Sequence, residues 1–170
     1  EIYNHGCNVV YNNGFTHDWF RSYISSGNKT YAFATDDVHC GVQANGEPTK
    51  GDNDSCGGYI NVSMPSLTYE NFFDAIENGR FYPSTGVEIK DLYIDEEKDE
   101  LVISCSPVST IIIKGNTCSS FKVPRIHTDE NEITNFVVSM ENIRKQYTYF
   151  WVELKTKEGK IAHSQPYFLK

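Results

Sequence analysis

The sequence predicts an α+β protein with two parts, strand and helix units up to about residue 86 followed by an all-β sandwich. In the first part, apolar strand-like segments alternate with amphipathic helices, which is the rhythm of parallel α/β structures. From Val87 onward, seven short strand-like segments separated by turn residues follow one another within about 80 residues, a pattern typical of β-sandwiches. We therefore expect a boundary near Gly86, between an α/β domain at 1–86 and an Ig-like sandwich at 87–170.

The first part contains two helices with recognisable start and stop signals. Thr16 can cap a helix over residues 18–26, which Gly27 would end, and Thr68 is the expected N-cap of a second helix that ends at Gly79. The apolar segments "EIYN", "TYAFAT" and "YINVSM" are predicted strands, and "TYAFAT" is apolar enough for a parallel strand buried on both faces. The polar segment between the last two strands, residues 40–58, predicts a long loop.

Composition and charge limit the class of protein. The 170 residues have a net charge of -8, and the 15 basic residues are scattered singly, which argues against nucleic-acid binding. No apolar run approaches the roughly 20 residues that a membrane helix needs. The cysteines form an odd set without CxxC spacing, which favours reduced thiols and a cytoplasmic location, with one disulfide and three free thiols as the alternative. The set is Cys7, Cys40, Cys56, Cys105 and Cys118.

The segment "ATDDVH" at 34–39 contains the candidate chemical groups. It follows a predicted strand, where parallel α/β structures place their functional loops. Side chains two apart in extended backbone point the same way, so Asp37 and His39 are expected to present an oxygen and a nitrogen to one divalent ion. His5, which follows the preceding predicted strand, could lie on the same rim. The alternative is that Asp36 and Asp37 shape a local turn and His39 is a solvated loop residue.

The order of these segments resembles a known family over residues 1–86. "EIYNH", "HDWFRSYISSGNKTYAFATDDVH" and "GGYINVSMPSLTYENFFDAIENGRFYPSTG" look like the C-terminal half of a PHP-type (polymerase and histidinol phosphatase) metal-dependent phosphoesterase. The resemblance implies a distorted (β/α)7 barrel whose rim binds about two or three divalent ions, Zn, Mn or Fe, and the hydrolysis of a phosphorylated small molecule by metal-activated water. It also implies that Asp37 and His39 are metal ligands, with His5 near an end-of-strand position of the family.

The resemblance covers only part of the family's ligand set. The HxH pair and the TDH-type motif are expected upstream of Glu1, so this polypeptide is expected to bind metal weakly and to catalyse little by itself. Its expected partner is the missing N-terminal half of the barrel, in the same chain or in a separate one. The sequence also leaves open a non-catalytic binding module, in which the sandwich recognises a glycan or a protein and the first part only supports it.

Arg80, an aromatic segment and two histidines are further candidates for function. Arg80, within "GRFYPSTG" at 79–86, could contact a substrate phosphate, and the alternative is a helix C-cap with a tight turn. The segment "YTYFWVELK" places an aromatic stripe on one face that could bind sugar, and the alternative is a core strand. The stripe consists of Tyr147, Tyr149 and Trp151. His127 and His163 are expected at the surface or at an edge of the sandwich.

Overall fold

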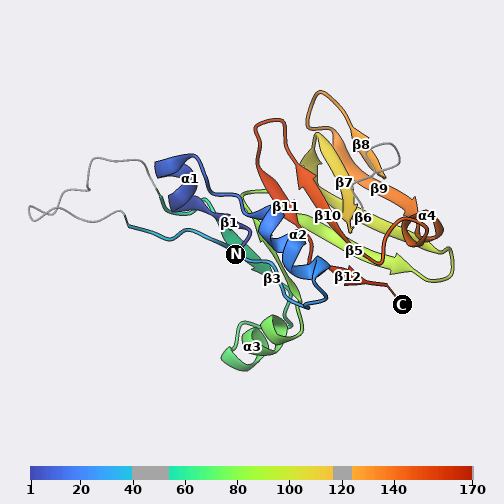
Figure 1. Cartoon of the computed structure of the whole chain (residues 1–170), viewed down its shortest axis with the longest axis horizontal. Helices are drawn as coiled ribbons and strands as arrows, with labels where there is room; N and C mark the ends of the chain where they lie inside the picture. The colour runs from blue at the N-terminus through green and yellow to red at the C-terminus, as the bar shows by residue number, and fades with distance from the viewer. Residues whose placement is uncertain (40–53, 117–123, 170) are drawn as a thin grey trace, which may run out of the picture. The chain divides into compact units, whose positions relative to one another are not determined.

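The computed structural model describes residues 1–39, 54–116 and 124–169 (Figure 1). The chain divides into two compact units, Glu1–Thr85 and Gly86–Lys170. The described residues form a mixed α/β structure with mostly antiparallel strand pairs and few helices. The α+β class expected from the sequence is confirmed at this level.

The first unit begins with two short parallel strands. β1 (Tyr3–Asn4) pairs with β2 (Ala34–Thr35), and Tyr3 lies opposite Ala34. The backbone contact extends to the flanking residues, because the Ile2 N–H donates to the Phe33 carbonyl oxygen at 2.8 Å. The predicted parallel strand at 30–35 is confirmed in its direction, although β2 itself is only two residues long.

Two helices follow β1 along the chain. α1 (His5–Tyr11) was not predicted, and its N-cap is Asn4, whose side-chain oxygen accepts from the Cys7 N–H at 2.7 Å. α2 (His17–Ser25) begins directly after Thr16, as predicted, but the Thr16 hydroxyl donates to the Glu1 carbonyl oxygen and does not cap the helix. No helix in the described part of the chain is long and apolar enough to cross a membrane.

The first unit ends with a helix between two antiparallel strands. α3 (Tyr69–Glu77) has the predicted N-cap, since the Thr68 hydroxyl oxygen accepts from the Asn71 N–H at 3.2 Å. β3 (Tyr59–Val62) pairs with β4 (Phe81–Ser84). Gly79 comes directly after the end of α3 and has a left-handed φ of 67°, which agrees with a helix cap. The tight turn expected in the rest of 79–86 is wrong, because Phe81–Ser84 form β4.

The second unit contains two antiparallel groups of strands and one short helix. One sheet has the order β5-β6-β9, and in the other the order is β11-β10-β7-β8, with β12 also paired to β10. α4 (Met140–Arg144) follows β9 directly. The strands are β5 (Ile89–Asp95), β6 (Glu100–Val108), β7 (Thr110–Gly115), β8 (Arg125–His127), β9 (Ile133–Ser139), β10 (Tyr149–Lys155), β11 (Ile161–His163) and β12 (Tyr167–Phe168).

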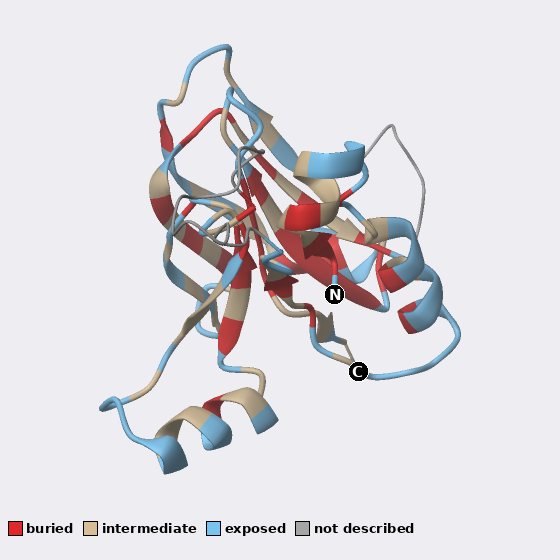
Figure 2. Cartoon of the chain, turned by 90° about the vertical axis from the view of Figure 1, so that its left-hand side faces the viewer, coloured by how far each residue is buried: buried red, intermediate tan, exposed pale blue. Residues whose placement is uncertain are grey.

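The core of the second unit follows from the burial pattern of its strands. Buried and half-buried residues alternate along β6 and β7, which is the pattern of strands with one face in a core. β10 differs, because four consecutive residues from Tyr149 to Val152 are buried. The interpretation of this segment as a core strand is confirmed. Figure 2 shows the buried segments of the chain in red. The surface position expected for His163 is wrong, because its side chain is fully buried and stacks on Trp151.

Candidate functional site

The carboxylate of Asp36 shapes the segment that follows β2. Its Oδ1 atom accepts hydrogen bonds from the backbone N–H groups of Gly57 at 2.8 Å and Gly58 at 2.7 Å, and its Oδ2 atom accepts from Cys56 at 2.6 Å. The Asp36 carbonyl oxygen accepts from the Gly6 N–H at 2.8 Å. Asp36 therefore connects the end of β2 both to α1 and to residues 56–58.

These contacts also determine the charge of Asp36. Partial burial raises the pKa of its carboxyl group, but the three backbone N–H donors and the nearby His5 imidazole lower it by more, so the pKa lies below its ordinary value. Asp36 is therefore ionised at neutral pH, with both oxygens already engaged by the backbone. It positions the loop, and the neighbouring side chains remain the better candidates for binding an ion.

Asp37 and His39 meet through a tight turn. Asp37 has a φ of 51°, in the left-handed region, so the extended backbone expected from the sequence is wrong at this residue. The turn nevertheless brings His39 Nδ1 to 3.8 Å from the Asp37 Oδ1 atom and to 2.6 Å from the Asp37 carbonyl oxygen. Both side chains are open to solvent, with 47% of Asp37 and 76% of His39 exposed. The Asn4 side-chain amide donates to the other carboxylate oxygen of Asp37 at 3.1 Å.

The imidazole of His39 faces Asp37 with its Nδ1 atom. A carbonyl oxygen only accepts hydrogen bonds, so the contact with Asp37 assigns the proton of the neutral ring to Nδ1 and leaves the lone pair on Nε2. Metal-bound histidines usually donate their second ring N–H to such an acceptor. The backbone N–H of His39 also donates to the buried Asp54 carboxylate at 2.6 Å. A carboxylate and an imidazole are donor types that suit Zn, Mn or Fe, and a shared ion would have to lie on the Nε2 side of the ring, away from the contact with Asp37 that the structure shows.

His5 belongs to the Asp36 cluster in this structure. Its Nδ1 lies 3.0 Å from the Tyr3 hydroxyl oxygen, and its ring packs directly on Gly57, where an added Cβ would lie 2.2 Å from three ring atoms. Its contacts are thus with residues that surround the Asp36 carboxylate. Within the described residues, no three His, Cys, Asp or Glu side chains lie close enough to hold one ion together.

Arg80 lies between the end of α3 and the start of β4. Its guanidinium group donates to the Asp74 carboxylate of α3, and its backbone N–H donates to the Ala75 carbonyl oxygen at 2.8 Å. The Arg80 side chain is 43% exposed. The side chain of Arg80 thus contacts α3, and its carbonyl oxygen accepts from the Ser63 N–H at 2.8 Å. None of the contacts that the structure gives for Arg80 is with residues 36–39.

Two residues that position the site were not predicted from the sequence. Asn4 caps α1 and contacts Asp37, and Asp54 binds the backbone of His39. The alternative in which Asp36 and Asp37 shape a local turn agrees with the structure, because the Asp36 carboxylate accepts from three backbone N–H groups and Asp37 has a left-handed φ. The pair Gly57 and Gly58 was the available signal, since two residues without side chains let consecutive N–H groups approach one carboxylate. Cys40 and most of the loop predicted at 40–58 lie outside the described residues.

No protein-family model, curated protein or solved structure matches this chain. The fold and the site define a mixed α/β protein with a carboxylate and an imidazole held together after a parallel strand.

Proposed function

We propose that the chain is the C-terminal part of a metal-dependent phosphoesterase of the PHP type. In this proposal residues 1–86 complete a distorted (β/α)7 barrel, and residues 87–170 form an Ig-like sandwich. The main support is the turn after β2, where the Asp37 carboxylate and the His39 imidazole lie together and His39 Nδ1 is engaged by a carbonyl oxygen. In such an enzyme the divalent ions, Zn, Mn or Fe, activate the attacking water and neutralise the charge of the phosphoryl group.

The side chains of this chain have distinct roles in the proposal. Asp37 and His39 supply ligand atoms, and Asn4 orients Asp37 by donating to its carboxylate. His5 is a further candidate ligand through its Nε2 atom, because Nδ1 faces the Tyr3 hydroxyl. Arg80 is the candidate contact for the phosphate of a small-molecule substrate, for which its guanidinium group has to exchange Asp74 for the substrate.

The proposal includes a partner, the N-terminal half of the barrel, in the same polypeptide or in a separate one. α2 supports this, because only one half of its apolar face is buried. Phe20 and Ile24 are buried, whereas Trp19 and Tyr23, also one turn apart, are 80% and 52% exposed. A neighbouring barrel helix would cover such a face. A cytoplasmic location is also part of the proposal, supported by the free thiols of Cys7, Cys56 and Cys105.

Metal binding by the chain alone is the first test. We expect Mn²⁺ to broaden the NMR signals of Asp37 and His39 selectively, with weak affinity because the ligand set is partial. The variants Asp37→Ala and His39→Ala should lose this broadening, and Glu70→Ala, which removes an exposed carboxylate from α3, should keep it. Broadening that is equal in all of these proteins contradicts the proposed ligands.

Activity is tested in the full-length protein that contains this chain. We expect Asp37→Ala and His39→Ala to lower both bound metal and phosphatase turnover by about 100-fold or more, and Asn4→Ala to lower turnover by about 10-fold with less metal loss. Glu70→Ala is the matched control, with unchanged turnover. Unchanged metal content and turnover in both ligand variants would refute the phosphoesterase proposal.

A further inference from the structure

The chain contains three Asn-Gly pairs, and such pairs can modify themselves. The glycine backbone nitrogen loses its proton and attacks the asparagine Cγ atom, a succinimide ring forms, and the amide nitrogen leaves as ammonia. Water then opens the ring at either carbonyl group and gives aspartate or isoaspartate. Glycine favours this reaction because no side chain shields its nitrogen and its backbone is the least restricted. Asn13–Gly14 and Asn78–Gly79 are described by the structure, and Asn45–Gly46 lies outside the described residues.

Hydrogen bonds protect both reacting groups of Asn78–Gly79. The Asn78 side-chain amide donates to the Asp74 carbonyl oxygen and to the Asp74 carboxylate, both at 2.8 Å. The Gly79 N–H donates to the Ile76 carbonyl oxygen at 3.2 Å. The leaving group and the attacking nitrogen are thus both engaged at the end of α3, and these bonds have to break before the ring can close.

Asn13–Gly14, which follows α1, lacks these restraints. Asn13 is exposed, and among the described residues neither its side-chain amide nor the Gly14 N–H forms a hydrogen bond. The structure also requires the glycine, because an added Cβ at Gly14 would lie 2.5 Å from both the Asn4 carbonyl oxygen and the Asn8 Cβ atom. The fold therefore keeps a glycine directly after an exposed asparagine whose amide is not held.

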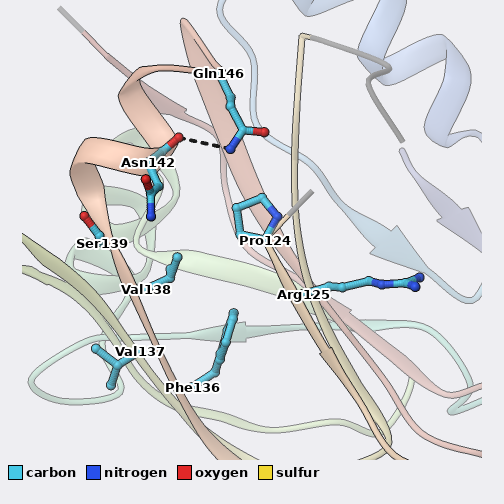
Figure 3. Close-up of a pocket in the computed structure, with 8 residues that line it drawn as sticks. All are labelled: Pro124, Arg125, Phe136, Val137, Val138, Ser139, Asn142 and Gln146. Atoms are coloured by element: carbon cyan, nitrogen blue, oxygen red, sulfur yellow. Dashed lines mark hydrogen bonds between the residues drawn. The ribbon is translucent and has the colours of Figure 1, made fainter. Parts of the chain in front are cut away.

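Asn142 of α4 shows that exposure alone is not sufficient. It lines a cavity of about 570 Å³ in the second unit, where the Gln146 amide donates to its main-chain carbonyl oxygen at 3.1 Å (Figure 3). Its own side-chain amide forms no hydrogen bond with the described residues, as at Asn13. The next residue, however, is Ile143, whose branched side chain is fully buried and shields the nitrogen that would attack.

We propose that Asn13 is a site of spontaneous deamidation, and that isoaspartate formed there displaces Asn4. The Gly14 carbonyl oxygen accepts from the Asn4 N–H at 2.9 Å. Isoaspartate adds one carbon atom to the main chain directly before Gly14, so the tightly packed glycine cannot keep this hydrogen bond. Asn4 caps α1 and donates to the Asp37 carboxylate, so the change reaches the segment after β2. This inference does not depend on the proposed phosphoesterase activity.

The rate of the reaction is measured in the whole chain at pH 8, by mass spectrometry of its peptides and by labelling with an isoaspartate-specific methyltransferase. The synthetic peptides VYNNGFTH (10–17) and AIENGRFY (75–82) give the rate of each pair without the fold. We expect Asn13 in the chain to react within about 3-fold of its peptide, a smaller difference than a typical hydrogen bond causes. Asn78 should react at least about 10-fold more slowly than its own peptide. Asn142 should remain unmodified over the same period.

Asp74→Ala is the matched variant for the protection at α3. It removes the carboxylate that accepts from the Asn78 amide, and the Asp74 side chain is 59% exposed, so the helix should remain folded. We expect deamidation of Asn78 to become about 3-fold faster or more in this variant, and that of Asn13 to stay unchanged. Deamidation of Asn13 that the fold slows as much as that of Asn78 would overturn the proposed site.

The effect on Asn4 is measured by NMR of the ¹⁵N-labelled isoaspartate form, which anion exchange separates from the parent chain by its additional negative charge. We expect the Asn4 amide signal to shift and its hydrogen exchange to become faster, with the α4 signals unchanged. Asn13→Asp is the control, because it adds the same charge without lengthening the main chain, and it should leave the Asn4 signal nearly unchanged. An Asn4 signal that is the same in the isoaspartate form and in Asn13→Asp would overturn the proposed displacement.

Discussion

The Oδ1 atom of Asp36 lies 2.8 Å from the backbone nitrogen of Gly57, and this hydrogen bond joins the end of β2 to a residue 21 positions farther along the chain. The N–H groups of Cys56 and Gly58 converge on the same carboxylate. All three bonds involve an ionised acceptor, and such bonds are stronger than neutral ones. Asp36 is therefore the side chain of this region whose replacement should disturb the structure most.

The first prediction concerns Asp36→Asn. The amide group would turn a donor toward at least one of the three backbone N–H groups, which then loses its acceptor. We expect the free energy of unfolding of the first unit to fall by about 1–3 kcal/mol. Urea denaturation followed by circular dichroism measures it. Asp37→Asn is the control, since that carboxylate is 47% exposed, and its replacement should cost less than about 0.5 kcal/mol. Equal losses in the two variants would contradict the role given to Asp36.

The second prediction is the pH dependence of this contribution. The pKa of Asp36 is lower in the folded chain than its ordinary value of 3.8. Its stabilising effect is therefore fully present above the unfolded pKa and is lost as the pH falls through the folded pKa. We expect the stability difference between the wild-type chain and Asp36→Asn to be constant from neutral pH to about pH 5 and to shrink below about pH 4.

The comparison of two proteins is necessary because other carboxyl groups also titrate. Asp95 and Asp99 have lowered pKa values through hydrogen bonds from Lys98 and Arg144, so they contribute to acid unfolding as well. They are present in both proteins, and their contribution cancels in the difference. A difference that stays constant down to pH 3 would show that the carboxylate of Asp36 is not the group responsible.

Sequence signals were sufficient where the structure is determined locally. Thr68 caps α3 through its own hydroxyl, and α2 starts directly after Thr16. The alternating residues of β6 and β7 were also recognisable, because period-two burial leaves a direct trace in the sequence. β4 was missed because Pro83 is unusual in a strand and its pairing with β3 bridges the whole of α3.

The candidate site was predicted only in part, because its contacts also join residues that are far apart in the sequence. Asp37 and His39 were selected from their spacing in an extended strand, but the left-handed φ of Asp37 brings them together by another route. The partners of Asp36 lie about 20 residues away, and the pattern "DDVH" contains no trace of them. The burial of His163 depends likewise on Trp151 of a neighbouring strand.

The third prediction concerns the contact between His5 and Gly57. The imidazole ring covers Gly57 so closely that an alanine Cβ there would lie 2.2 Å from the ring atoms. We expect Gly57→Ala to displace His5 and to lower the free energy of unfolding by about 1–3 kcal/mol. In the His5→Ala background the same change should cost clearly less, because the ring is absent. A double-mutant cycle measured by urea denaturation tests this. Additive effects of the two changes would exclude a direct contact.

The fourth prediction concerns the reactivity of two free thiols. Cys105 on β6 is fully buried, and burial raises the pKa of its thiol to about 11, with Lys90 opposing this only partly. Cys56 is exposed beside Asp36. Alkylation requires the thiolate, and raising a thiol pKa from 9.0 to about 11 lowers the thiolate fraction at pH 8 by about 100-fold, before burial blocks access.

Alkylation of the native chain with iodoacetamide at pH 8, followed by mass spectrometry of its peptides, measures the difference. We expect Cys56 to be labelled at least 100-fold faster than Cys105, and Cys105 to react readily only in denaturant. The variant Cys56→Ser should lack the rapid label at that position and leave the slow reaction of Cys105 unchanged. Rapid labelling of Cys105 in the native chain would contradict its buried position on β6, where its exposed fraction is 0% and its Sγ atom lies 3.8 Å from the Ile133 carbonyl oxygen.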